Sequence, residues 1–175
     1  MLIFLIGYMG SGKSTVGRKL ADRLKLQFLD LDAYIEERNL CAIPEIFAKE
    51  GENGFREKEH KALKEVADFE NIIIATGGGV PCFFDNMQII NNAGISVYLD
   101  VHPKILAKRL LKSKIDRPLI MGKTPSELED FLAKTLNQRS PFYQQAKLVI
   151  HVGEKETVEE LVAKMEKLIK ENRFE

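Results

Sequence analysis

The stretch Gly7-Tyr8-Met9-Gly10-Ser11-Gly12-Lys13-Ser14 decides the fold of this chain, because it matches the pattern G-x-x-x-x-G-K-[ST] of a phosphate-binding loop. The preceding residues 2–6 form an unbroken apolar run of strand length, and apolar side chains recur at helical spacing over residues 16–24. Glycines let backbone N–H groups approach phosphate oxygens, and the helix start adds unsatisfied N–H groups and the positive end of its dipole. The sequence therefore predicts a strand, a loop and a helix that bind a nucleoside triphosphate.

Two side chains of this loop carry specific chemistry. The Lys13 ammonium can bridge the β- and γ-phosphates, and the Ser14 hydroxyl can ligate Mg²⁺. We therefore expect a nucleoside triphosphate as the ligand and Mg²⁺ as the cofactor. The loop residues expected to hold the nucleotide are Gly10, Ser11, Gly12, Lys13, Ser14 and Thr15.

Composition places the chain among ordinary globular proteins. A length of 175 residues favours one domain over residues 1–175, with 45% apolar and 30% charged residues. The formal net charge is zero, so no overall field directs the chain to nucleic acid or to an anionic membrane. We find no signal peptide, no apolar run of membrane-spanning length and no paired cysteine motif. These features predict a cytoplasmic monomer without nucleic-acid or membrane partners.

Short apolar segments alternate with helical patterns along the chain. Strands are expected at residues 2–6, 27–29, 71–75, 96–99 and 148–150, with helices between them. Pro103 suits the first turn of a helix, and Thr124 and Thr157 each begin a capping box with a glutamate three residues later. The alternation predicts a three-layer α/β fold with a doubly wound, five-stranded parallel sheet.

Polar groups follow two of these strands. Asp30 and Asp32 come at the end of the second strand, where open α/β sheets place their chemistry. Either aspartate could instead serve as the N-cap of the next helix. Gly77-Gly78-Gly79 follows the strand at 71–75, and three consecutive glycines favour close approach of a ligand to the backbone over a simple turn.

Two segments interrupt the regular pattern. Residues 32–64 are helical, rich in charge and broken near Gly51, with a helix start at Pro44. Residues 112–122 are basic, lack an apolar period and contain Pro118 and Gly122. A connection of that length in a compact domain favours a mobile lid.

Together these motifs make the chain resemble the shikimate kinase family, of the nucleoside monophosphate kinase-like branch of phosphate-loop proteins. The resemblance covers residues 2 to about 170, and no motif position departs from the family pattern. Its motifs, in the family's order, are Gly7 to Ser14, Asp30-x-Asp32, Gly51-Glu52-x-x-Phe55-Arg56-x-x-Glu59, Gly77-Gly78-Gly79, Arg117-Pro118-Leu119 and Arg139-x-x-x-Tyr143.

This resemblance implies ATP-dependent phosphorylation of the 3-hydroxyl of shikimate, a step toward chorismate and the aromatic amino acids. It implies catalytic roles for Lys13, Asp32 and Arg117, and a nucleotide site that also includes Arg109 and Arg117, with the adenine flanked by Arg109 and the loop after His151. Mg²⁺ would be held by Ser14 and, through a water molecule, by Asp30. The resemblance also implies that the helical segment of about 32–64 binds the substrate. The implied shikimate site comprises Asp32, Phe47, Phe55, Arg56, Glu59, Gly77, Gly78, Gly79 and Arg139.

The residue chemistry agrees with this assignment but does not by itself fix the acceptor. A carboxylate substrate is matched by the paired N–H groups of arginine, and substrate hydroxyls are matched by a carboxylate. Gluconate is also a hydroxy acid, so another small-molecule kinase such as gluconate kinase is the first alternative. A nucleotide-dependent switch that hydrolyses ATP without an acceptor is the second.

Overall fold

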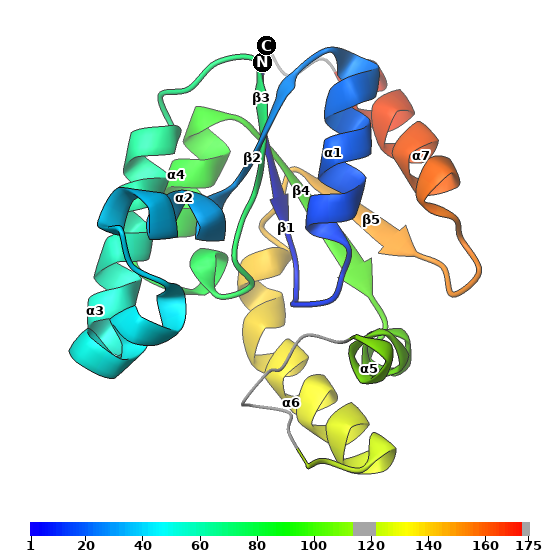
Figure 1. Ribbon diagram of the computed structural model, residues 1–175. Helices are drawn as coiled ribbons and strands as arrows, with labels where there is room; N and C mark the ends of the chain where they lie inside the picture. Colours follow the sequence, from blue (N-terminus) through cyan, green and yellow to red (C-terminus); the bar gives the residue numbers. More distant parts are fainter. Residues whose placement is uncertain (114–121, 173–175) are drawn as a thin grey trace.

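A five-stranded parallel sheet forms the centre of the computed structural model, which describes residues 1–113 and 122–172 (Figure 1). Its strands are β1 (Leu2–Ile6), β2 (Gln27–Asp30), β3 (Ile72–Ala75), β4 (Ile95–Val101) and β5 (Leu148–Val152). The strand order is β2-β3-β1-β4-β5, and every neighbouring pair is parallel. The predicted doubly wound sheet is confirmed.

Helices cover both faces of this sheet. They are α1 (Lys13–Leu24), α2 (Leu31–Asn39), α3 (Ile43–Val66), the 3₁₀ helix η1 (Val80–Cys82), α4 (Asn86–Ala93), α5 (Pro103–Lys112), α6 (Pro125–Tyr143) and α7 (Val158–Glu171). Helices α1 and α7 lie on one face, whereas α3 and α4 lie on the other (Figure 1). No helix in the described part of the chain is long and apolar enough to span a membrane.

The central strand β1 joins two hydrophobic cores. Ile3 and Leu5 pack with α1 and α7 on one face, and Phe4 and Ile6 pack with α2, α3 and α4 on the other. All four side chains are fully buried. Burial on both faces explains why the sequence shows an unbroken apolar run here and no alternation.

Most helix boundaries follow the sequence signals. Pro103 is the first residue of α5, and the capping boxes at Thr124 and Thr157 begin α6 and α7. Helix α3 is broken at Gly51, whose φ of 69° and ψ of −173° are not helical. Several boundaries differ from expectation by one or two residues, among them the start of α2 at Leu31, the end of β4 at Val101 and the end of β5 at Val152.

The extra length of β4 comes from pairing with β5. Asp100 interrupts the apolar run, so the sequence pattern ends the strand at Leu99. In the structure Asp100 pairs in register with His151, and the Asp100 carboxylate lies 2.8 Å from the His151 Nδ1 atom. A polar pair between neighbouring strands therefore continues a strand that apolar periodicity alone would end.

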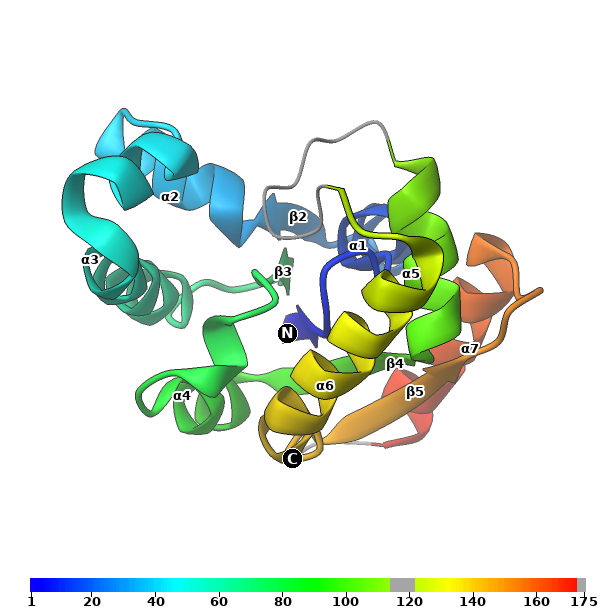
Figure 2. The ribbon, with the colours of Figure 1, turned by 90° about the horizontal axis from the view of Figure 1, so that it is seen from below.

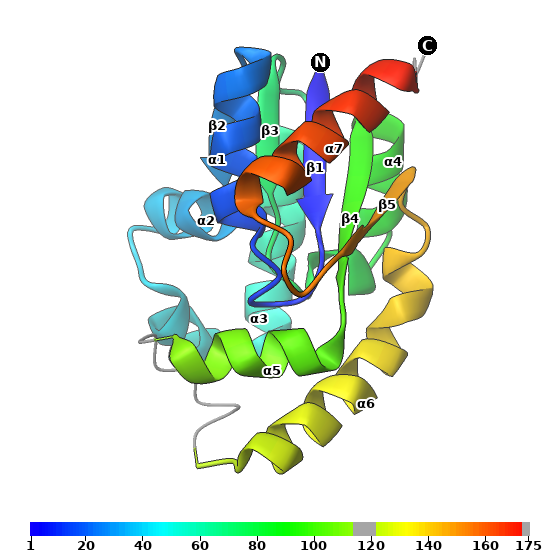
Figure 3. The ribbon, with the colours of Figure 1, turned by 90° about the vertical axis from the view of Figure 1, so that its right-hand side faces the viewer.

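The carboxyl ends of the strands face a region flanked by two groups of helices. Helices α2 and α3 lie on one side and α5 and α6 on the other, with the loop between β1 and α1 between them (Figure 2). Helices α5 and α6 extend beyond the ends of the strands (Figure 3). Most of the predicted lid at 112–122 is formed by residues 114–121, which lie outside the described residues.

Candidate active site

The phosphate loop connects β1 to α1 with a backbone that only glycine adopts readily. Gly12 is the N-cap of α1 and has a φ of 97°, in the left-handed region. The Lys13 ammonium is buried and donates hydrogen bonds to the carbonyl oxygens of Gly7, at 2.8 Å, and Tyr8, at 2.9 Å. The loop thus holds a cation beside the N-terminus of a helix, an arrangement that suits anionic phosphates.

Ser14 and Asp30 meet beside this loop. The Ser14 hydroxyl donates to Asp30 Oδ2 at 2.8 Å. The other carboxylate oxygen of Asp30 accepts from the Asp32 backbone N–H, at 3.1 Å, and so caps α2. The N-cap role that the sequence left open for Asp30 is therefore filled by one oxygen, while the other oxygen is paired with Ser14 beside the phosphate loop. The cap also explains why α2 begins directly after β2.

A cavity of about 280 Å³ lies on the outer side of the phosphate loop. Its lining residues are Gly10, Ser11, Gly12, Thr15, Val16, Arg109, Glu156, Thr157, Val158 and Leu161. Arg109 donates to the Ser11 carbonyl oxygen at 3.1 Å, and burial lowers the pKa of its guanidinium. The sequence prediction named Arg109 and the loop after His151, but not Glu156, Thr157 and Val158 individually, because a capping box carries no signal for a ligand.

The three glycines after β3 lie against three different parts of the site. A Cβ at Gly77 would lie 2.8 Å from Asp32 Oδ1, and one at Gly79 would lie 2.5 Å from Arg56 Nη1. A Cβ at Gly78 would lie 3.4 Å from Arg139 Nη1 and 3.3 Å from the Met9 backbone nitrogen. The atoms that approach these glycines are thus side chains of the site and the phosphate loop itself. Close approach, and not a positive φ, therefore disfavours a side chain at these positions, most strongly at Gly77 and Gly79.

Arg56 and Glu59 form a buried ion pair on α3. Arg56 Nη1 donates to Glu59 Oε2 at 2.8 Å, and the Glu59 side chain is only 1% exposed. The guanidinium also lies 4.2 Å from the centre of the ring of Phe83, which is the residue that follows η1. Burial raises the pKa of Glu59, although the adjacent Arg56 opposes that shift. Glu59 therefore fixes the direction of Arg56, and its ionised form depends on that partner.

Asp32 lies between the phosphate loop and α3. Burial, followed by repulsion from Asp30, raises the pKa of its carboxyl above the ordinary value, while Lys13 and Arg56 lower it. The structure therefore brings this carboxylate within electrostatic reach of the phosphate-loop lysine and of an arginine on α3. A carboxylate with a raised pKa is a stronger base than an exposed one.

Arg139 and two phenylalanines complete the cluster. The Arg139 guanidinium lies 5.2 Å from the centre of the Tyr8 ring, so the last turns of α6 reach the phosphate loop. The rings of Phe47 and Phe55 are 4.6 Å apart, on either side of the break in α3. Sequence reasoning missed Tyr8 and Phe83, which hold the two arginines, because aromatic residues in loops are usually packing residues. Arg117 lies outside the described residues.

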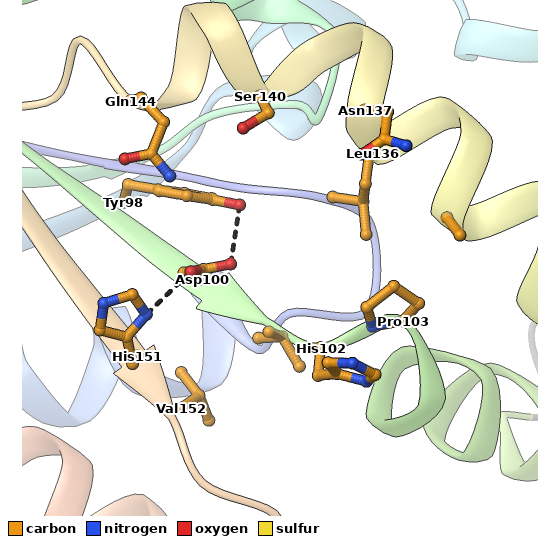
Figure 4. Close-up of a pocket in the computed structure, with 12 residues that line it drawn as sticks. Tyr98, Asp100, His102, Pro103, Leu136, Asn137, Ser140, Gln144, His151 and Val152 are labelled. Atoms are coloured by element: carbon orange, nitrogen blue, oxygen red, sulfur yellow. Dashed lines mark hydrogen bonds and ion pairs between the residues drawn. The ribbon is translucent and has the colours of Figure 1, made fainter.

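A separate cavity of about 380 Å³ lies at the carboxyl ends of β4 and β5, against α6 (Figure 4). The Tyr98 hydroxyl donates to Asp100 Oδ1 at 3.1 Å, and Asp100 pairs with His151 (Figure 4). Of the predicted site residues that the structure describes, none lines this cavity.

Comparison with known proteins identifies the family. The shikimate kinase family model matches residues 9–170. The chain belongs to the shikimate kinase family. It is 47% identical over 170 residues to a shikimate kinase of Bacteroides thetaiotaomicron, with 95% of this chain and 97% of the relative covered. The family prediction from the sequence motifs is therefore confirmed.

Solved structures agree over nearly the whole chain. A crystal structure of the Bacteroides thetaiotaomicron shikimate kinase has a TM-score of 0.91 at 45% identity and covers 97% of this chain and 98% of its own. The shikimate kinase of Acinetobacter baumannii, solved in complex with shikimate, has a TM-score of 0.88 at 36% identity, with coverages of 99% and 95%. The fold described above is the fold of these kinases.

Proposed function

We propose that the phosphate loop and the cluster around Asp32, Arg56 and Arg139 form one active site. There this member of the shikimate kinase family transfers the γ-phosphoryl group of ATP to the 3-hydroxyl of shikimate, a step toward chorismate. The observation that carries the proposal is the glycine run 77–79, which contacts Asp32, Arg139, Arg56 and the phosphate loop together. The complex of the Acinetobacter baumannii relative with shikimate supports the choice of acceptor.

The nucleotide would occupy the side of the phosphate loop that faces Arg109. Its phosphates would replace the carbonyl oxygens of Gly7 and Tyr8 as partners of the Lys13 ammonium. The adenine would lie in the cavity between Arg109 and residues 156–158, where one wall is a guanidinium and the other is the N-terminal turn of α7. We therefore add Thr157 and Val158, as adenine contacts, to the nucleotide-binding residues expected from the sequence.

Shikimate would occupy the side that faces α3. Its carboxylate would pair with the guanidinium groups of Arg56 and Arg139, which approach neighbouring glycines of the run 77–79. Phe47 and Phe55 would pack against the ring of the substrate. Asp32 would accept a hydrogen bond from the 3-hydroxyl, and its raised pKa suits it to take the proton as the phosphoryl group arrives.

Mg²⁺ fits the pair formed by Ser14 and Asp30. A hydroxyl oxygen and a carboxylate oxygen lie 2.8 Å apart beside the phosphate loop, and Mg²⁺ prefers oxygen ligands, few of them from protein and several from water and phosphates. Ser14 would bind the ion directly and Asp30 through water, because Asp30 also caps α2. When bound, Mg²⁺ neutralises charge on the phosphates.

Transfer itself requires positioning and charge stabilisation more than covalent chemistry. Lys13 would stabilise the charge of the migrating phosphoryl group, and the buried arginines would hold the acceptor in line with it. We keep Arg117 as a third catalytic residue on the strength of its family motif. We also propose that the chain is cytoplasmic and acts as a monomer. Light scattering of the purified protein would test the oligomeric state.

A coupled assay of ADP release tests the function. We expect rapid ADP formation with shikimate, little with gluconate and almost none without an acceptor. Lys13→Ala should lower kcat by about 10²- to 10³-fold, as removal of a charge-stabilising group does. Equal rates with gluconate would favour the alternative kinase, and acceptor-independent hydrolysis would favour a nucleotide-dependent switch.

A further inference from the structure

The hydroxyl of Tyr143 lies at the junction between α6 and the glycine run. Tyr143 is the last residue of α6, has a fully buried side chain, and donates a hydrogen bond to the Gly78 carbonyl oxygen at 2.6 Å. Gly78 is the glycine that lies between Arg139 and the backbone of Met9. One hydroxyl therefore holds the peptide that separates the acceptor side from the phosphate loop.

Arg139 lies next to this hydroxyl. Arg139 and Tyr143 are four residues apart on α6, so their side chains lie on the same face of the helix. Burial lowers the pKa of the Arg139 guanidinium, and the interaction with Tyr143 raises it. A guanidinium can only donate, and the Tyr143 oxygen keeps its lone pairs while its proton goes to Gly78, so this oxygen can accept from Arg139. One oxygen atom thus lies beside both a side-chain cation and a backbone peptide.

Packing fixes the Tyr143 ring from behind. It stacks on Tyr98 with ring centres 5.0 Å apart and an angle of 29° between the rings. The Tyr98 hydroxyl points toward Asp100, in the cavity beside β5, and donates to its carboxylate (Figure 4). The two tyrosines therefore share one stack, but only one hydroxyl reaches the acceptor side. Tyr98 is therefore a matched control for Tyr143.

We propose that Tyr143 is a positioning residue for the acceptor substrate, whose hydroxyl orients the Arg139 guanidinium and the Gly78 peptide toward the substrate carboxylate. The inference rests on the proposed placement of shikimate. It differs from an ordinary buried hydrogen bond in one respect. An ordinary bond would contribute to folding alone, whereas a positioning bond affects the affinity for one ligand and spares the other.

The test compares Tyr143→Phe with Tyr98→Phe, because each variant keeps its ring and loses one buried hydroxyl. Calorimetry with shikimate and with a non-hydrolysable ATP analogue gives the two affinities, and steady-state kinetics gives KM and kcat. Tyr143→Phe should weaken shikimate binding about tenfold or more, as expected for loss of a hydrogen bond to a charged group. Its nucleotide affinity and that of Tyr98→Phe for both ligands should stay within about twofold.

A double-mutant cycle gives a second, independent readout. With Arg139→Ala in place, Tyr143→Phe should cause little further loss of shikimate affinity, because the group that it orients is gone. Measuring shikimate binding at saturating nucleotide keeps both variants folded, since a bound ligand stabilises the native state. Additive losses in the cycle would show that Tyr143 does not act through Arg139.

Other outcomes separate this proposal from the proposed function. If Arg139→Lys weakens shikimate binding but Tyr143→Phe does not, the acceptor site stands and the positioning role is wrong. If neither variant changes shikimate binding, the acceptor has been placed wrongly. If both phenylalanine variants lower stability and both affinities alike, Tyr143 is a structural residue and the proposal is overturned.

Discussion

At the scale of single residues, the glycine run 77–79 is where the site is most constrained. Each glycine lies against a different functional group, and a methyl group at Gly79 would overlap the Arg56 guanidinium, with contacts of 2.5 to 2.8 Å. Arg56 cannot retreat freely, because it is paired with Glu59 and packed on Phe83. The backbone and the ion pair therefore compete for the same space.

Gly79→Ala should consequently act on the acceptor and not on the nucleotide. We expect shikimate affinity to fall by about tenfold or more, as displacement of a charge pair does, with nucleotide affinity unchanged. Calorimetry with each ligand measures both. In an Arg56→Ala background the same substitution should have little further effect, since the clashing group is absent. Equal losses in both backgrounds would show that Gly79 acts in some other way.

Asp32 should show opposite effects on stability and activity. Its pKa is raised from 3.8 in the folded chain, chiefly by burial, so protonation favours the folded state. That stabilisation is complete at low pH and is lost as pH rises through the folded pKa, which leaves a penalty at neutral pH. Asp32→Asn removes the charge and should raise the free energy of unfolding at pH 7 while lowering kcat by about 10²- to 10⁴-fold.

Urea denaturation at several pH values checks the stability half of this prediction. The advantage of Asp32→Asn over the parent chain should shrink as pH falls through the folded pKa, because both side chains then become neutral. A variant that is less stable than the parent at pH 7 would contradict the burial argument.

At the scale of elements, the break in α3 sets the shape of the acceptor side. Gly51 divides a helix that would otherwise run straight from Ile43 to Val66, and the Phe47 and Phe55 rings meet across the break, 4.6 Å apart and tilted by 31°. No atom lies within 4 Å of a Cβ built on Gly51. Any cost of a side chain at this position is therefore a cost of backbone conformation alone.

Gly51→Ala should lower the free energy of unfolding by about 1 to 3 kcal/mol, the range for a residue held in a glycine-only region of φ and ψ. The matched control is Gly153→Ala, which has a nearest Cβ contact of 3.5 Å and no positive φ. Chemical denaturation should separate the two variants. Gly51→Ala should also lose shikimate affinity together with stability, because Phe47 would be displaced from Phe55.

Elements were predicted from the sequence where local chemistry alone determines them. The capping boxes at Thr124 and Thr157, the phosphate loop and the apolar runs of the strands all act within a few residues. The end of β4 was missed because it depends on His151, a residue 51 positions from Asp100. The helix η1 was missed because its residues follow the glycine run, whose conformation is set by Arg56 and Asp32 through space.

At the scale of the whole molecule, the two proposed ligand sites lie on different sides of the phosphate loop. Arg109 faces the cavity beside α7, and Arg139 faces the glycine run from α6. The motifs predicted both arginines, but the sequence could not show that Tyr143 and Tyr98 form one stack behind Arg139. Those contacts join β4 to α6, and no local pattern encodes such a pairing.

Shikimate and an ATP analogue, bound on different sides of the phosphate loop, should stabilise the folded chain independently. At a concentration of about one hundred times its dissociation constant, each ligand adds about 2.7 kcal/mol to the free energy of unfolding, which raises the Tm of a chain of this size by about 5 to 10 °C. We expect Arg139→Lys to lose about half or more of the shikimate shift, because lysine keeps the charge but lacks the planar pair of donors. Its shift with an ATP analogue should remain.

Arg109→Ala should show the reverse pattern, with a reduced nucleotide shift and an unchanged shikimate shift, because its guanidinium contacts the phosphate loop and the cavity beside α7. Thermal denaturation of three chains with each ligand at fixed concentrations measures all six shifts. The opposite losses in the two variants cannot come from general destabilisation, which would lower the Tm without ligand but leave both shifts intact. If one variant loses both shifts equally, the two ligands do not occupy separate sides of the phosphate loop.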